Sequence, residues 1–357
     1  MRLKTLLPLA CASALSLCAC GGGDHAGDPA ASYDWTALSQ TLDSYIGSGD
    51  GQVTGYSFAM NVGGETVYTR AGGDLTTDAV VPIASASKAP AATVILTLVD
   101  DGLIALDTPV SKYIGSSIDW PVLKGDITMR MLLNHTSGLP FDSECMNDDN
   151  TTLQDCAQEI AHKALNFRPG EKFGYSGAGY QVAGYIAEKV SGKSWQQLVQ
   201  ERLSGPLGMT SFSYGSGSNP RIAGGAVSSA ADYLKFTQLW LDGGKLGKTQ
   251  ILTANDIALG KTDQITGLPV YYTPVPQGSA LNGYSFGWWL TDSDAIGGSA
   301  GPELSDPGLL GTTPWMDYDQ RYTAALLLTS TTDIGIAMWH AARTDILAQL
   351  NPAMPMP

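Results

Sequence analysis

The spacing of apolar residues in the first third of the chain changes from helical to strand-like and back. Trp35, Leu38 and Leu42 recur at helical spacing and predict an opening amphipathic helix. Over residues 55–73, "GYSFAMNVGGETVYTRAGG" alternates apolar and polar residues around two adjacent glycines, which predicts a β-hairpin. A long apolar run headed by Ser85 then predicts a buried helix.

The rest of the chain is helical in its middle and strand-like near its end. Between about 103 and 279 the pattern is mostly helical, with clear helices near 177–190 and 229–241. The later segments "YSFGWWL", "TTPWMDY" and "RYTAALLLTS" predict strands, and "GIAMWHAARTDILAQL" predicts a closing helix. We therefore expect an α/β (α+β) fold, with one sheet formed by about 33–102 and 280–357 and interrupted by a mainly helical part, 103–279.

The N-terminus has the pattern of an export signal. Arg2 and Lys4 precede an apolar stretch that is too short for a permanent membrane span. The four residues "LCAC" that end at Cys20 resemble a bacterial lipobox, so we expect residues 1–19 to be a lipoprotein signal peptide and Cys20 to be lipidated. Residues 20–32 would form a flexible tether. Cleavage nearby without lipidation is the alternative.

Composition excludes several classes of function. The chain has 357 residues, 43% of them hydrophobic, which is enough for a large core. Its formal charge of −14 lacks the basic footprint of a nucleic-acid binder, so a membrane contact is expected only through the lipid anchor. The four histidines are scattered, and no nucleotide or dinucleotide fingerprint is present, so we expect neither a metal nor a cofactor.

Two of the five cysteines remain after the signal and its anchor are set aside. Cys145 and Cys156 flank the loop-like "MNDDNTTLQD". In an exported protein such a pair most simply forms a local disulfide, which stabilises by roughly 3 kcal/mol in the loop-closure picture. A free catalytic thiol is the alternative, although no histidine pattern accompanies either cysteine.

The head of the apolar run has the chemistry of a nucleophile and its base. Lys88 follows Ser85 by three residues and therefore lies on the same helix face. Burial lowers the pKa of a lysine, and a neutral amine can accept the serine proton. The alternative is that Ser85 caps the helix and that Lys88 is an ordinary solvated residue, since S-x-x-K is frequent by chance.

Four further segments, read together with Ser85-x-x-Lys88, form a pattern of motifs along the chain. They are "LLNHTSGLP" (132–140), "RPGEKFGYSGAGYQVAGYIAEKVSG" (168–192), "PLGM" (206–209) and "AGGAVSSAADYLKF" (223–236). In this order the five segments resemble the serine β-lactamase and penicillin-binding protein superfamily, especially its class C-like and family VIII esterase branches. The resemblance covers about residues 35 to 350. It implies an antiparallel sheet flanked by helices, with the active site between the sheet part and an inserted helical domain.

The resemblance assigns the second motif to Tyr175-Ser176-Gly177. Tyr175 would be a phenolate-capable partner of Lys88 that passes the serine proton to the leaving group. From the residues alone, a tyrosine in this setting is more often a packing residue. Gly177 stands where the family usually has an asparagine that binds the amide of β-lactam substrates.

The third motif, normally Lys-Thr-Gly or His-x-Gly, aligns best with Asp306-Pro307-Gly308. Asp306 would then stand where the family has a cation for the substrate carboxylate, and we expect it to repel such a group. The backbone N–H groups of Ser85 and Leu309 would form the oxyanion hole. The alternative is that residues 306–308 form a loop and that the true third motif lies elsewhere.

Other polar and aromatic residues give weaker signals. His135 stands in a helix-ending turn and is expected to be a scaffold element rather than a catalytic residue. Gly177, Trp288 and Trp315 are candidates for lining an acyl pocket, although strand tryptophans more often belong to the core. Gly297-Gly298-Ser299-Ala300-Gly301, with His340 downstream, matches the G-x-S-x-G elbow of α/β-hydrolases but lacks the helix that must follow.

These observations favour an exported serine hydrolase that cleaves a small-molecule ester or other acyl substrate through an acyl-enzyme on Ser85. We expect ester chemistry rather than amide chemistry because of Gly177 and Asp306. The first alternative is a D,D-peptidase or a β-lactamase-type amide hydrolase. The second is a penicillin-recognising lipoprotein that binds cell-wall peptide with weak turnover. We expect the protein to be a lipoprotein on the periplasmic or cell-surface face of a membrane.

Overall fold

The computed structural model describes residues 33–47, 52–115, 117–292 and 302–351. The expected signal and tether, the lipidation residue Cys20 and the elbow residue Ser299 lie outside these ranges. Within them, no helix is long and apolar enough to cross a membrane. The same residues contain no cluster of three or more His, Cys, Asp or Glu side chains that could hold a metal ion.

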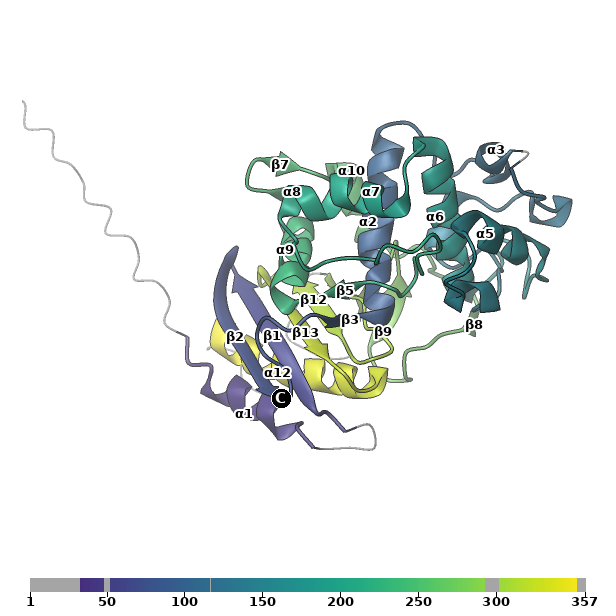
Figure 1. Ribbon diagram of the computed structural model, residues 1–357. Helices are drawn as coiled ribbons and strands as arrows, with labels where there is room; N and C mark the ends of the chain where they lie inside the picture. Colours follow the sequence, from purple (N-terminus) through teal and green to yellow (C-terminus); the bar gives the residue numbers. More distant parts are fainter. Residues whose placement is uncertain (1–32, 48–51, 116, 293–301, 352–357) are drawn as a thin grey trace, which may run out of the picture. The chain divides into compact units, whose positions relative to one another are not determined.

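A seven-stranded sheet is assembled from the two ends of the chain (Figure 1). Its order is β2-β1-β13-β12-β11-β10-β9, and all neighbouring strands pair antiparallel. The strands are β1 (Gly55–Val62), β2 (Glu65–Gly73), β9 (Leu281–Tyr284), β10 (Trp289–Thr291), β11 (Glu303–Ser305), β12 (Thr313–Asp317) and β13 (Tyr322–Leu328). The α/β fold with one antiparallel sheet is confirmed.

Two details of the late strands differ from the prediction. The segment "YSFGWWL" is two strands rather than one, because a tight turn closed by the Ser285 N–H and the Trp288 carbonyl at 2.8 Å separates β9 from β10. Strand β11 lies outside the segments that the sequence predicted as strands. Its three residues are too few to show a period, and their burial comes from the neighbouring strands.

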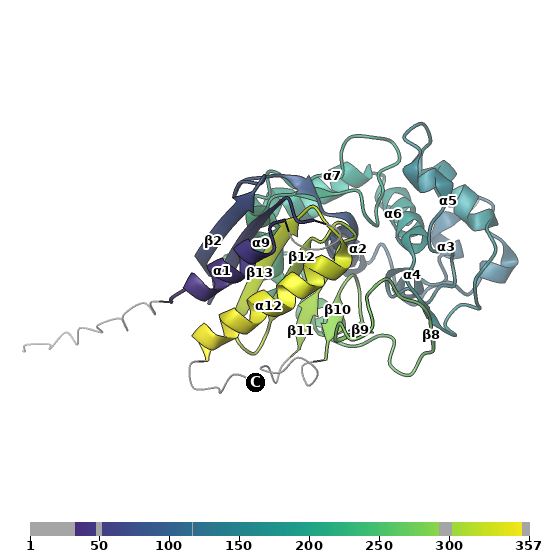
Figure 2. The same ribbon diagram turned by 90° about the horizontal axis from the view of Figure 1, so that it is seen from below.

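Apolar layers lie on both faces of the sheet. In β13, Tyr322 and Leu326 belong to the core shared with α1 (Thr36–Ser44) and α12 (Thr332–Leu350), whereas Leu327 belongs to the core on the opposite face. This alternation follows from the two-residue period of a strand. Figure 2 shows α1 and α12 along one face. The other face is covered by α9 (Ala230–Leu241), although α9 falls in the part predicted as the helical insertion.

Most remaining elements are helices and two-residue or three-residue strands. The helices are α2 (Lys88–Asp100), α3 (Ser111–Ile114), α4 (Met129–Leu133), α5 (Leu153–His162), α6 (Gly177–Ser191), α7 (Trp195–Val199), α8 (Gly205–Leu207), α9 (Ala230–Leu241) and α10 (Ala254–Gly260). The short strands pair as β3 (Val81–Pro82) with β5 (Val227–Ser228), β4 (Phe173–Gly174) with β8 (Val270–Tyr272) and β6 (Lys245–Leu246) with β7 (Thr249–Gln250). Several helices begin where a Ser or Thr side chain accepts an N–H of the first turn, as Ser176 does for α6 and Ser229 for α9.

Helix α2 lies in the interior, as its sequence predicts. Its residues from Lys88 to Leu98 are all buried, because the helix is apolar on every side. It packs against α6 and α7 of the helical part. The consequence for function is that α2 begins in the interior of the protein, so its first residue, Lys88, is buried rather than exposed to solvent.

A second buried lysine has a structural role. Lys124 donates from Nζ to the carbonyls of Ile160, Ala161 and Lys163 at 3.0, 2.6 and 2.6 Å, at the C-terminal end of α5. We expect Lys124→Met to lower the free energy of unfolding by about 1–3 kcal/mol, because these carbonyls lose their donor. Urea unfolding of the variant measures this, with the exposed Lys112→Met as the control. Equal midpoints for the two variants would contradict the assigned role.

Candidate active site

Ser85 and Lys88 meet in the geometry of a nucleophile and its base. Ser85 lies in a 3-10 turn, Ala84–Ser87, directly before α2, rather than in the α-helix itself. Ala84, with a φ of 47°, turns the chain so that the half-buried Ser85 side chain faces a cavity. Lys88 Nζ lies 3.0 Å from Ser85 Oγ and 2.8 Å from the Ala223 carbonyl oxygen.

The surroundings of Lys88 suit it to act as a base. Only 2% of the residue is exposed, and this burial lowers its pKa to about 7. The negative charge of Asp306 opposes the shift, and the positive charge of Arg221 adds to it. Near neutral pH a substantial fraction of the amine is therefore uncharged and able to accept the Ser85 proton.

Tyr175 lies over the same amine. Lys88 Nζ is 4.6 Å from the centre of the Tyr175 ring, and the Tyr175 backbone N–H donates to the Tyr272 carbonyl at 3.1 Å. Burial raises the Tyr175 pKa well above its usual value, Asp306 raises it further, and the nearby Ser85 hydroxyl counteracts part of the rise. The buried hydroxyl has no hydrogen-bond partner of ordinary geometry among the described residues. The Tyr175 side chain at rest is therefore a neutral phenol.

His135 holds the second motif in place. Its Nδ1 accepts the Ser176 backbone N–H at 3.1 Å, which leaves Nε2 as the protonated nitrogen that donates to Tyr284 Oη at 3.0 Å. Burial lowers its pKa well below the usual value. The ring also contacts the Tyr175 ring, with centroids 4.3 Å apart. Both nitrogens are committed to the scaffold, as the sequence predicted.

Asp306 does not face the substrate, which corrects the sequence prediction. The residue is fully buried, and its Oδ2 accepts the backbone N–H of Ala89 at 3.1 Å, at the start of α2. Oδ1 has no hydrogen-bond partner within the described part of the chain. Burial raises the Asp306 pKa well above its usual value, and the charge of Lys88 opposes that rise. The carboxyl therefore holds the start of α2 and acts on Lys88, and it does not itself line the cavity.

The loop after Asp306 approaches the nucleophile closely. A Cβ on Gly308 would lie 2.3 Å from the Ile83 carbonyl oxygen, so only glycine allows this contact. The Gly308 N–H donates to the Thr312 carbonyl at 2.7 Å and closes the loop. Leu309 is 70% exposed and lines the same cavity as Ser85. Its backbone N–H remains the second predicted oxyanion donor, and Gly308 keeps this loop beside the nucleophile.

A cavity of about 150 Å³ contains these groups. It is lined by Ala84, Ser85, Lys88, Phe141, Asp142, Tyr175, Gly177, Arg221, Ala223, Gly224, Tyr272, Pro274, Val275, Pro307, Leu309 and Thr332. The expectation that Trp288 and Trp315 line the pocket is wrong. Trp288 stacks on Phe236 with ring centroids 5.6 Å apart, and Trp315 donates from Nε1 to Tyr322 Oη at 2.9 Å, so both fill cores beside the sheet.

Gly177 lines the cavity, as predicted, and a side chain there would require its neighbours to shift. A Cβ at this position would lie 2.8 Å from Met146 Cε and 3.3 Å from the Phe141 carbonyl oxygen. The loop that carries Phe141 and Met146 therefore packs closely against Gly177. Among the described residues that line the cavity, none has an amide side chain that could bind a substrate amide.

The disulfide between Cys145 and Cys156 is present and ties that same loop to α5. Asn219 fixes it from the other side, because its Nδ2 donates to the carbonyls of Cys145 and Asp148 at 2.7 and 3.0 Å. The predicted disulfide is thus confirmed. It belongs to the support of the cavity wall rather than to the catalytic groups.

Sequence reasoning missed Arg221, Asp142 and Tyr272, which also line the cavity. Arg221 stands two residues before the "AGG" of the 223–236 segment, and the Ala223 carbonyl that receives Lys88 Nζ is part of that segment. The proximity of Arg221 to a recognised segment was a usable signal. Asp142 and Tyr272 lie in loops and in an exposed short strand without any pattern of their own.

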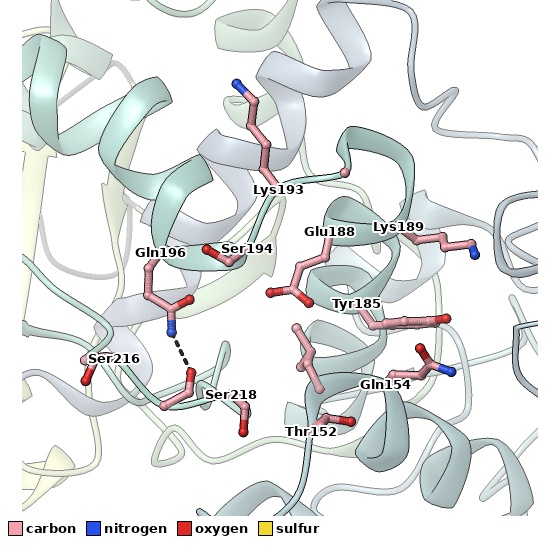
Figure 3. A pocket seen from close by; sticks show the side chains of 14 residues that line it. Thr152, Gln154, Tyr185, Glu188, Lys189, Lys193, Ser194, Gln196, Ser216 and Ser218 are labelled. Carbon is pink, nitrogen blue, oxygen red and sulfur yellow. Dashed lines mark hydrogen bonds between the residues drawn. The ribbon is translucent and has the colours of Figure 1, made fainter.

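A larger hollow of about 770 Å³ lies in the helical part (Figure 3). Its polar groups are engaged in local structure: Thr152 and Ser194 cap α5 and α7, Glu188 accepts the Trp195 N–H at 2.7 Å, and Gln196 donates to the Gly217 carbonyl. The residues that line it include none of those around Ser85. We therefore place the site at the smaller cavity.

Known proteins resemble this chain over most of its length. The beta-lactamase family model matches residues 38–344. Penicillin-binding protein 4 of Amycolatopsis lactamdurans is 27% identical over 259 residues, which are 63% of this chain and 66% of that protein, so the chain spans just under two thirds of that relative's length.

Two solved structures share the fold. A protein assigned as a beta-lactamase from Bacteroides dorei DSM 17855 is 27% identical and has a TM-score of 0.77, with 89% of this chain and all of that one covered. EstCE1, a hydrolase with promiscuous acyltransferase activity, is 18% identical and has a TM-score of 0.71, with 88% and 98% covered, which shows the fold alone. The three relatives differ in described activity, so they do not select a substrate.

Proposed function

Because the chain belongs to the beta-lactamase family, we propose that it is a serine hydrolase that cleaves esters through an acyl-enzyme on Ser85. The observation that carries the hydrolase chemistry is the contact between Lys88 Nζ and Ser85 Oγ at 3.0 Å in a site where burial lowers the lysine pKa to about 7. Such a lysine can activate serine without a histidine.

The geometry suggests a sequence of proton transfers. Ser85 Oγ attacks the ester carbonyl while neutral Lys88 accepts its proton. The backbone N–H groups of Ser85 and Leu309 stabilise the oxyanion. The Tyr175 phenol donates a proton to the departing alkoxide and regains one from Lys88. Water then attacks the acyl-enzyme, and Lys88 accepts a proton from the water. The ester bond to Ser85 breaks, and the proton returns to Ser85 Oγ, which regenerates the hydroxyl.

The cavity wall supports ester rather than amide substrates. Gly177 has no side chain to bind a substrate amide, and Met146 and Phe141 pack closely against it. An ester needs no such partner, and its alkoxide leaves more readily than an amine. The proposal does not rely on repulsion by Asp306, because that carboxyl is buried and does not line the cavity.

The test compares an ester with a β-lactam. We expect the mature domain to hydrolyse p-nitrophenyl butyrate and Ser85→Ala to reduce the rate to that of the buffer, because the variant lacks the nucleophile. A chromogenic cephalosporin should be turned over slowly or not at all. Rapid cephalosporin hydrolysis would instead support a β-lactamase or D,D-peptidase. Capture of a labelled penicillin on Ser85 without ester turnover would support a penicillin-recognising, cell-wall-binding protein.

We further propose that the protein works outside the cytoplasm. Disulfides such as Cys145–Cys156 persist in oxidising compartments. Export as a lipoprotein anchored at Cys20 remains a proposal from the sequence. Metabolic labelling with a radioactive fatty acid in a bacterial host, with Cys20→Ser as the control, would test the anchor.

A further inference from the structure

An ion pair lies at the cavity that contains Ser85. Arg221 Nη2 is 3.1 Å from Asp142 Oδ2, and Arg221 Nη1 donates to Asn147 Oδ1 at 2.6 Å. Both charged residues line the cavity. The side chains are 42% and 35% exposed, so solvent or a substrate can reach the pair. These two contacts use only part of the five N–H donors of a guanidinium.

The backbone of Arg221 is fixed relative to the reacting groups. Its carbonyl accepts the Gly225 N–H at 2.7 Å, and the next residue, Ile222, donates its N–H to Gln181 Oε1 at 3.1 Å. One residue further, the Ala223 carbonyl accepts from Lys88 Nζ. The charge of Arg221 is near enough to lower the Lys88 pKa. A substrate group held by Arg221 would therefore be held at a defined place relative to Ser85.

Of the two cationic side chains among the described residues that line the cavity, Arg221 is the one that a substrate can reach. Among the described residues that line it, the cations are Lys88 and Arg221, and Lys88 is enclosed and engaged in catalysis. The third-motif position offers no cation, because Asp306 stands there and is buried. Tyr272, Pro274, Val275, Pro307 and Leu309 give another part of the lining an apolar character.

We propose that Arg221 binds a carboxylate at the far end of the acyl group, so that the preferred substrates are esters of short dicarboxylic acids. This inference rests on the proposed ester cleavage and names its substrate class. Arginine suits the role because its planar guanidinium matches a carboxylate and remains charged. Asp142 and Asn147 orient the guanidinium, and the apolar lining contacts the methylene chain between the two carboxyl groups. The cavity volume of about 150 Å³ suits a short chain.

The experiment compares two p-nitrophenyl esters of equal chain length. Mono-p-nitrophenyl glutarate ends in a carboxylate, and p-nitrophenyl valerate ends in a methyl group. We expect Arg221→Gln to lower the ratio of their kcat/KM values, glutarate over valerate, by about tenfold, since a charge-assisted hydrogen bond is lost in a partly exposed site. Arg221→Lys should recover part of the ratio because it keeps the charge. The ratio for wild type should also fall with added salt.

Arg202→Gln is the matched control. Arg202 forms a comparable ion pair with Asp101, with side chains 30% and 42% exposed, and neither residue lines this cavity. The ratio should be unchanged in this variant. An Arg221→Gln variant that changes both esters by the same factor would overturn the proposal, because the ion pair would then be purely structural.

Failure of the proposed ester chemistry would look different. In that case wild type and Ser85→Ala would hydrolyse neither ester above the buffer rate. Binding of free glutarate to Ser85→Ala, measured by calorimetry with and without Arg221→Gln, would still test the anion site. Binding that Arg221→Gln weakens would support the site, and binding that is absent or unaffected by the substitution would overturn it.

Discussion

Replacing Lys88 by methionine is expected to lower kcat/KM toward p-nitrophenyl butyrate by about 10²–10⁴-fold, the usual contribution of a general base. Methionine has nearly the length of the lysine stem and fits a residue that is 2% exposed. The substitution also removes the donor to the Ala223 carbonyl and the cation beside the buried Asp306, so the fold should survive with a lower free energy of unfolding. Steady-state kinetics and a thermal melt of the same preparation measure the two effects.

The Lys88 amine also determines how kcat/KM of the wild-type protein depends on pH. Burial lowers the Lys88 pKa to about 7. Only the neutral amine accepts the Ser85 proton, so kcat/KM should rise with pH through about 7 and fall about tenfold per pH unit well below it. Lys88→Met should lose this acidic limb together with its activity. A variant that keeps both the rate and the limb would remove Lys88 from the mechanism.

The fold was largely predictable because its signals are local. The alternation over 55–73 and the apolar run from Ser85 became the hairpin β1–β2 and the buried helix α2. The elements that were missed lack such signals. Strand β11 has three residues, which is shorter than any useful period, and the break between β9 and β10 comes from a two-residue turn inside an apolar segment.

The site was predictable where neighbours in sequence are neighbours in space. The contact of Ser85 with Lys88 follows from their three-residue spacing. The errors concern direction, because the sequence does not show toward which side of the sheet a residue of β12, or of the turn before β10, points. Trp288 and Trp315 were placed in the pocket for that reason, whereas both fill cores. Arg221 was missed because its partners Asp142 and Asn147 are more than seventy residues away.

Asp306→Lys is expected to prevent stable folding, which is the reverse of what the sequence alone suggested. If Asp306 faced the substrate, a lysine there would attract carboxylate-bearing substrates. In the structure the side chain is fully buried beside Lys88 and accepts the Ala89 N–H at the start of α2. A lysine would place a second cation there, at the positive end of a helix dipole, at a cost of several kcal/mol. Soluble yield and thermal melting measure the loss.

Asp306→Asn separates the charge of this carboxyl from its hydrogen bond. The amide oxygen can still accept the Ala89 N–H, so the start of α2 should keep its place. The negative charge of Asp306 favours the protonated form of Lys88. Without that charge the Lys88 pKa falls further, the neutral amine persists to lower pH, and the acidic limb of kcat/KM should move toward acid. A limb that stays in place or moves toward alkaline pH, in a variant that melts like wild type, would contradict the coupling. A shift toward acid would instead establish Asp306 as a positioning residue that sets the pKa of Lys88 without touching the substrate. A purely structural role in anchoring α2 would not produce this shift.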